Sequence, residues 1–272
     1  MDLLEIKEAA RKIRRDTIDM IYKVKSGHPG GALSIADILA VLYFSEMRID
    51  PENPHWEDRD RFVLSKGHAC TSLYAALSQR GYFPREKLWT LRQYKSILQG
   101  HPDMKSTPGI DMSSGSLGQG LSIANGMALA ARLQNKSYRV YVVLGDGELE
   151  EGQVWEAAMT AAQYKLDNLV AFVDANALQI NGTTDDVMKV EPIKGKFEMF
   201  GWHVIEVDGH DILALQKALQ TAKNIKGKPV MIVAKTIKGK GVSFMEGQAK
   251  WHSGVLTQEE YEKAVAGLGG SC

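Results

Sequence analysis

The spacing of apolar residues near the start of the chain is typical of helices. Apolar side chains recur at three- and four-residue steps from Leu3 to Val24, which predicts one amphipathic helix over residues 3–24. A second helix is predicted over residues 34–47, with Ser34 as its N-cap. We therefore expect the N-terminal third of the chain to be helical.

The pattern changes after about residue 138, where short apolar runs rich in β-branched residues alternate with helical spacing. Runs that are apolar throughout are typical of strands covered on both faces. The order of strand, helix and strand predicts an α/β fold with a doubly wound, mainly parallel sheet flanked by helices. No linker or repeat interrupts the pattern, so we expect a single domain over residues 1–272. Strands are expected at 140–144, 169–173, 203–207 and 229–233, and helices at 123–131, 155–164 and 212–223.

Polar residues follow two of the predicted strands at the points where they end. Gly145, Asp146 and Gly147 come after the first strand, and Asn176 follows the second. If these strands are neighbours, about 4.8 Å apart, the Asp146 carboxylate and the Asn176 amide oxygen can grip one hard cation. The glycines would leave N–H groups open to phosphate, and Mg²⁺ usually completes its shell with phosphate oxygens. The pattern indicates a metal-bridged diphosphate, with a tight turn and an N-capping acid as the alternative interpretation.

Composition and charge exclude several classes of partner. The chain has 33 Lys+Arg and 33 Asp+Glu, so no net charge attracts it to nucleic acid or anionic lipid. No apolar run approaches the roughly 20 residues of a spanning helix, and charges interrupt the N-terminus where a signal peptide is apolar. We expect a cytoplasmic protein with no membrane or nucleic-acid partner. Cys70 and Cys272 are too few and too far apart to predict a disulfide or zinc framework.

Seven sequence blocks appear together in an order that is similar to the N-terminal half of a transketolase. The GDG segment at 145–147, followed by Asn176 and by ING at 180–182, resembles the thiamine diphosphate fingerprint. The whole set spans residues 26–254, which is most of the chain. The other blocks are SGHPGG at 26–31, LSKGHA at 64–69, GHP at 100–102, GSLGQG at 115–120, KTIKGKG at 235–241 and WHSG at 251–254.

The resemblance implies roles for four histidines that lie beside glycine, proline or serine. In the family, the histidines that match His28, His101 and His252 point at the hydroxyls of the donor sugar and at the reacting carbon. The histidine that matches His68 lies close to the diphosphate. Imidazole suits this chemistry because either ring nitrogen can donate or accept a proton near neutral pH.

The resemblance also implies the cofactors, thiamine diphosphate and Mg²⁺, with Ca²⁺ as the alternative cation. In the family, the backbone at Gly115 and Leu117 lies against the aminopyrimidine ring, although this chain has Ser116 where many transketolases have proline. Read without the family, the segment is a glycine-rich turn. The residues implied for the metal are Asp146, Asn176 and the carbonyl of Leu178, and those for the diphosphate are Gly145, Asp146, Gly147 and Asn176.

Two further features have a family role and a simpler interpretation. Glu151 and Glu156 match glutamates that relay protons between two cofactors near the subunit contact. Taken alone, they are acids in the first turn of a helix, which the helix dipole favours. Residues 238–241 match a loop that closes over the thiazolium side, and are otherwise a solvated loop.

Full-length transketolases continue through two more domains, one of which supplies the glutamate that helps to activate the cofactor. No residue here can be assigned that role, so the resemblance implies the N-terminal subunit of a split transketolase, completed by a C-terminal subunit, with two copies of each chain. The expected reaction transfers a two-carbon ketol unit from a ketose phosphate to an aldose phosphate, as in pentose phosphate metabolism. The alternatives are a subunit of a 1-deoxyxylulose-5-phosphate synthase-like or 2-oxo acid dehydrogenase-like enzyme, or a non-catalytic cofactor-binding module.

Overall fold

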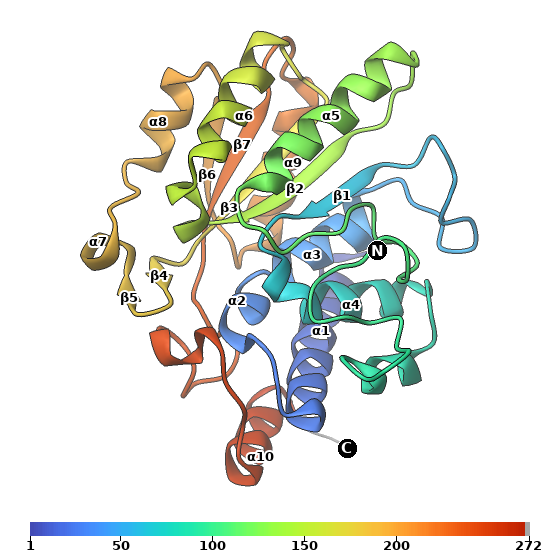
Figure 1. The fold of residues 1–272 in the computed structure, drawn as a ribbon, viewed down its shortest axis with the longest axis vertical. Helices are drawn as coiled ribbons and strands as arrows, with labels where there is room; N and C mark the ends of the chain where they lie inside the picture. Colours follow the sequence, from blue (N-terminus) through green and yellow to red (C-terminus); the bar gives the residue numbers. More distant parts are fainter. Residues whose placement is uncertain (270–272) are drawn as a thin grey trace.

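The computed structural model describes residues 1–269 and contains a five-stranded parallel sheet (Figure 1). The four strands predicted from the sequence are present, and the doubly wound fold is confirmed. The sheet nevertheless begins earlier than residue 138, because the short segment RFVL pairs with the next strand along its whole length. The strand order is β1 (Arg61–Leu64), β2 (Val140–Gly145), β3 (Leu169–Ala175), β7 (Val230–Lys235) and β6 (His203–Asp208).

Helices cover both faces of the sheet, which explains why the strands are apolar throughout. The helices predicted over 3–24, 123–131, 155–164 and 212–223 are present, within a few residues at each end. One face packs against α1 (Leu3–Val24), α3 (Ala36–Val41), α4 (Cys70–Arg80) and α9 (Ile212–Asn224). The other packs against α5 (Gln119–Leu133), α6 (Gly152–Gln163) and α8 (Ile193–Met199), while α10 (Gln258–Gly267) lies against α1.

The helix predicted over residues 34–47 is wrong in its bounds and in its N-cap. The chain instead forms α2 (Pro29–Ser34), then α3, then a π turn over Leu42–Glu46. Ser34 ends α2, and its fully buried hydroxyl donates to the Asp174 carboxylate at 2.7 Å. The apolar spacing predicted the buried face correctly. Ser34 makes this tertiary hydrogen bond instead of capping a helix that starts after it.

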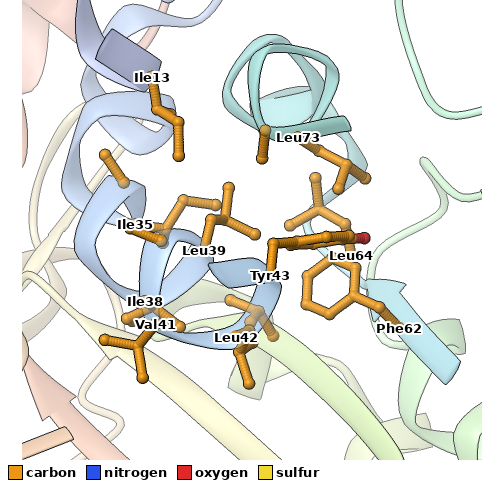
Figure 2. Close-up of a cluster of buried hydrophobic side chains, with 14 of the residues drawn as sticks. Ile13, Ile35, Ile38, Leu39, Val41, Leu42, Tyr43, Phe62, Leu64 and Leu73 are labelled. Carbon is orange, nitrogen blue, oxygen red and sulfur yellow. The ribbon is translucent and has the colours of Figure 1, made fainter. Parts of the chain in front are cut away.

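The core beneath β1 is built from residues far apart in the sequence. Figure 2 shows Ile13, Leu39, Tyr43, Phe62 and Leu73 pointing toward one another from α1, α3, the π turn, β1 and α4. Each of these side chains is almost completely buried. This packing fixes the end of β1, from which the next two residues enter the site described below. None of the helices within residues 1–269 has both the length and the apolar character needed to cross a membrane.

Of the two cysteines, the structure describes Cys70, which is a free thiol. Cys70 is buried, and its thiol donates to the Gly100 carbonyl at 3.2 Å. Burial raises the pKa of the Cys70 thiol to about 12, so the thiolate is disfavoured. Cys272 lies outside the described residues.

Candidate active site

The carboxyl ends of parallel strands meet at one edge of the sheet, where open α/β sheets bind ligands. β2 and β3 are hydrogen-bonded neighbours, with Gly145 opposite Asp174, so the predicted proximity of Asp146 and Asn176 is confirmed. The edge is also approached by α2 and by the hairpin of β4 (Leu178–Gln179) and β5 (Gly182–Thr183) (Figure 1). Together they enclose a cavity of about 350 Å³. Its lining includes His28, His68, Leu117, Asp146, Asn176 and His252.

Asp146 is held rigidly at the tip of β2. Its carboxylate accepts from the Gly147 amide at 2.8 Å and from the Ala177 amide at 2.6 Å, and only 4% of the residue is exposed. Burial, reinforced by the nearby Asp174 carboxylate, raises the pKa of Asp146 to about 6. No cation pairs with it among the described residues. The site therefore holds a carboxylate in a setting that favours a bound positive charge.

Asn176 is oriented by Asp174, a residue that the sequence analysis did not assign to the site. The Asn176 side-chain Nδ2 donates to Asp174 Oδ2 at 3.0 Å, so its Oδ1 is the acceptor atom, and it accepts from the Leu178 amide at 3.2 Å. Asp174 is fully buried and is paired with Lys66 at 2.5 Å. Burial would raise the pKa of Asp174, but Lys66 together with the hydrogen bonds from Thr236 and Ser34 outweighs burial and holds that pKa below its usual value. The buried Lys66–Asp174 ion pair thus fixes the orientation of the Asn176 side-chain amide.

The carbonyl of Leu178 faces the ammonium group of Lys238, a contact that the sequence pattern does not indicate. Lys238, in the loop after β7, donates from Nζ to this carbonyl at 2.8 Å and lies 3.2 Å from Nδ1 of His252. Burial, together with the charge of Lys66, lowers the pKa of Lys238 to about 8. The block at 235–241 indicated this loop, but only the fold shows that its lysine is buried beside the strand tips.

Three of the four predicted histidines form one cluster. The ring centroids of His28, His68 and His252 lie 5.2 to 5.6 Å from one another. Burial is the main cause that lowers their pKa values, to about 2 for His68 and about 4 for His252, with His28 shifted in the same direction. Nδ1 of His28 is buried and has no hydrogen-bond partner within residues 1–269. The cluster therefore presents neutral imidazoles that can both donate and accept.

His101 lies beside this cluster, next to the predicted cofactor loop. A Cβ atom at Gly115 would come within 3.0 Å of the His101 ring, so the ring lies against the backbone of this glycine. The His101 residue is exposed overall. Partial burial of its ring, together with the positive charge of Arg92, lowers its pKa. Gly115 and Leu117 line the cavity, as expected for a loop that contacts a ligand.

The two predicted relay glutamates are placed differently. Glu151 lines the cavity and lies against Gly118, where a Cβ atom would come within 2.7 Å of the Glu151 side chain. Glu156 lies one turn further along α6, exposed and outside the cavity lining. Its role at a subunit contact stays a prediction.

The depressed pKa of His68 predicts a specific loss of stability in acid. Between pH 6.5 and 4.5 the unfolded chain binds a proton at this histidine and the folded chain does not, so the free energy of unfolding falls as the pH drops. The expected slope from this residue is about 1 kcal/mol per pH unit. Denaturant unfolding of His68→Gln at pH 6.5 and 5.0 should show a smaller loss than wild type. An equal loss in both proteins would contradict the assigned environment.

The donors at this edge fit a cation and an anionic diphosphate held together. The side-chain oxygens of Asp146 and Asn176 and a backbone carbonyl suit a hard cation. Residues 1–269 contain no group of three His, Cys, Asp or Glu side chains placed to hold a metal, so amide, backbone, water or phosphate oxygens would complete the shell of a cation here. A methyl group at Gly31 would come within 3.3 Å of Lys66 Nζ, so a side chain at this position would crowd the buried Lys66–Asp174 ion pair beside the cavity.

Comparison with known proteins agrees with this geometry. The family described as "Transketolase, thiamine diphosphate binding domain" matches residues 6–271. The chain belongs to the transketolase family. Its similarity extends to solved structures: a transketolase from Campylobacter jejuni superposes with a TM-score of 0.93 at 37% identity, covering 99% of this chain and 43% of that protein.

Transketolase subunits of similar length are also among the relatives. The 6-deoxy-6-sulfo-D-fructose transketolase subunit of Clostridium sp. (strain MSTE9) is 49% identical, over 97% of this chain and 96% of that protein. One of the subunits of the apulose-4-phosphate transketolase of Phocaeicola vulgatus (strain ATCC 8482) is 46% identical, over 94% and 91% respectively. The chain thus matches these transketolase subunits almost end to end and spans about two fifths of the solved Campylobacter enzyme.

Proposed function

We propose that this chain is the diphosphate-binding subunit of a split transketolase that transfers a two-carbon ketol unit from a ketose phosphate to an aldose phosphate. One observation carries the proposal: a single cavity combines oxygen donors for a cation with a cluster of neutral imidazoles. A module that only bound a protein partner would have no chemical use for either group. In a 2-oxo acid dehydrogenase the imidazoles would meet no sugar hydroxyls.

The chain's own residues would hold the cofactor at its diphosphate end. Asp146, Asn176 and the Leu178 carbonyl are the proposed ligands of Mg²⁺ or Ca²⁺, and the ammonium groups of Lys66 and Lys238 face the same space. Thiamine diphosphate, when bound, supplies the electron sink for breaking a carbon–carbon bond next to a carbonyl. The protein contributes the fixed donors, so little reorganisation is needed at the moment of reaction.

The imidazoles are proposed to hold the hydroxyls of the donor sugar and to move protons at them. His28 supports this best, because its buried Nδ1 has no partner in the described chain and is therefore available to a ligand. Nζ of Lys238 lies within hydrogen-bond distance of Nδ1 of His252, so an ammonium group is adjacent to that ring. Neutral rings are suited to this work, since each has one donor and one acceptor nitrogen.

The partner is proposed to be a C-terminal subunit that carries the pyrimidine-binding and C-terminal domains, in an assembly with two copies of each chain. The relatives of similar length that are named as transketolase subunits support the need for a second chain. Glu151 at the rim of the cavity and the exposed Glu156 support a contact on this side of α6. The sugar phosphate itself would be held mainly by the partner.

The proposal is tested by reconstitution. The chain is purified, mixed with the candidate C-terminal subunit, and assayed with thiamine diphosphate and Mg²⁺ for transfer of a ketol unit from a ketose phosphate to an aldose phosphate. We expect turnover that depends on both subunits, and no release of CO₂ from a 2-oxo acid. Decarboxylation without ketol transfer would overturn the assignment.

Replacing the site histidines should impair turnover much more than cofactor binding. We expect His28→Ala, His101→Ala and His252→Ala each to lower kcat by about 10²–10⁴-fold, the usual effect of losing a positioned acid, base or donor. The dissociation constant for thiamine diphosphate should change little. The exposed His55 lies in a polar turn outside the cavity lining and gives the matched control, so His55→Ala should behave as wild type. Wild-type kinetics from a site variant would remove that residue from the site.

A further inference from the structure

Glu148 is a buried carboxylate in the cavity lining that the proposed reaction does not use. It lies in the 3₁₀ turn after β2 (Gly147–Glu150), and 3% of the residue is exposed. Three donors from three separate segments converge on it: the Ser65 hydroxyl, the Gly118 amide at 2.8 Å and the Gly145 amide at 3.0 Å. The carboxylate therefore connects the ends of β1 and β2 to the start of α5.

The bond to Gly118 controls the loop that carries Gly115 and Leu117. Gly118 is the N-cap of α5, with φ of 84°, and no side chain of its own segment caps this helix. A carboxylate 30 positions away pairs its amide instead. Gly115 and Leu117 line the cavity, and Gly145 precedes Asp146. The Glu148 carboxylate is therefore hydrogen-bonded to two separate segments of the cavity wall.

The charge of Glu148 cannot itself attract the cofactor. Within residues 1–269 no salt bridge includes Glu148, and its charge is met by backbone amides and one hydroxyl. Burial raises the pKa of Glu148, and its hydrogen bonds and the charge of Lys66 offset this effect only in part. An anionic diphosphate would be repelled by this group. Any favourable effect of Glu148 on binding must come from where it holds the two loops.

We propose that Glu148 is a positioning residue that fixes the 115–118 loop relative to the diphosphate turn, so that both ends of thiamine diphosphate meet a preformed cavity. The inference rests on the proposed function of the site. Glutamine cannot replace the glutamate, because its single side-chain oxygen must leave either the Gly118 amide or the Gly145 amide facing an NH₂ group. Losing the preformed loop raises the cost of ordering it upon binding.

The test compares two probes on the assembled complex by calorimetry: thiamine diphosphate and inorganic diphosphate, each with Mg²⁺. Glu148→Gln should raise the dissociation constant for thiamine diphosphate at least tenfold. It should leave that for inorganic diphosphate unchanged or lower, because this probe does not reach the loop and a negative charge has been removed. A parallel change for both probes, or unchanged thiamine diphosphate binding, would overturn the proposal.

Glu150 provides a matched control within the same turn. It also lines the cavity but is exposed, and within residues 1–269 its carboxylate accepts only from Gln179, so Glu150→Gln removes the same charge without touching the loop. We expect its effect on both probes to stay within about twofold. A tenfold loss for thiamine diphosphate in Glu150→Gln as well would show that the loss does not depend on the contacts of Glu148 with the loop, and would overturn the proposal.

A second variant covers the case in which Glu148→Gln does not fold. Ser65→Ala removes one anchor of the Glu148 carboxylate and keeps its charge, and should weaken thiamine diphosphate severalfold with no change for inorganic diphosphate. Hydrogen exchange of the peptide over residues 115–120 should be faster in either variant, and unchanged exchange would contradict the role. Failure of the wild-type complex to bind thiamine diphosphate would instead count against the proposed function.

Discussion

Asp146→Ala is expected to abolish Mg²⁺-dependent binding of thiamine diphosphate, because it removes the carboxylate of the proposed metal site. The remaining protein donors, the amide oxygen of Asn176 and the carbonyl of Leu178, are neutral, and the second already accepts from Lys238. Neutral oxygens and the diphosphate hold a hard cation much more weakly. Calorimetric titration with the partner subunit present should show a loss of more than about hundredfold in affinity.

Removing the charge of Asp146 should stabilise the fold of the cofactor-free chain, although it weakens cofactor binding. Because the pKa of this carboxyl is raised from 3.8 to about 6, its charged form destabilises the folded state, and stability is lost as the pH rises from about 4 to about 6. Asp146→Asn removes the charge and keeps an acceptor for the Ala177 amide, but the Gly147 amide, which donates to the other oxygen, loses its acceptor and offsets part of the gain. It should therefore stabilise the cofactor-free chain by roughly 1–2 kcal/mol at pH 7. Thermal unfolding of the cofactor-free protein measures this, and wild-type cofactor affinity in either variant would mean that residues 145–147 form only a turn.

Omitting the partner subunit should leave the chain almost inert in ketol transfer. The proposed role of the partner is to supply the glutamate that activates the cofactor, and no residue assigned in this cavity takes that role. Losing an essential group together with half of the site should reduce turnover far more than one missing contact does. The assay uses the purified chain with thiamine diphosphate and Mg²⁺, free of contaminating full-length transketolase. Robust turnover would overturn the split-site model.

Exchanging partners between two split transketolases extends this experiment. The histidines of this chain are proposed to face the first carbons of the donor, where ketoses offer a similar pattern of hydroxyls. Substrate chain length and the terminal phosphate should therefore be selected by the partner. We expect the preferred sugar phosphate to follow the C-terminal subunit when the N-terminal subunits are exchanged. A preference that stays with this chain would place specificity in its own cavity.

The sequence by itself determined the sheet and the place of the site. Continuous apolar runs can be buried only between two layers of helices, and parallel strands bring their carboxyl ends to one edge. For that reason the positions of Asp146 and Asn176, each just beyond a strand, were enough to predict that they meet. The histidine blocks gave the identities of the cluster, although not its spacing. The first strand was missed because four residues carry too little periodicity to separate a strand from a buried turn.

Only the tertiary structure decided how these groups are held. Lys66 and Asp174 lie 108 positions apart, and nothing in either segment alone indicates that Asp174 orients the amide of Asn176 while Lys66 neutralises that carboxylate. Glu148 likewise resembles a first-turn acid until the fold brings Gly118 and Gly145 to it. A buried charge is tolerated only where donors converge on it, and this convergence depends on the three-dimensional approach of distant segments rather than on local pattern.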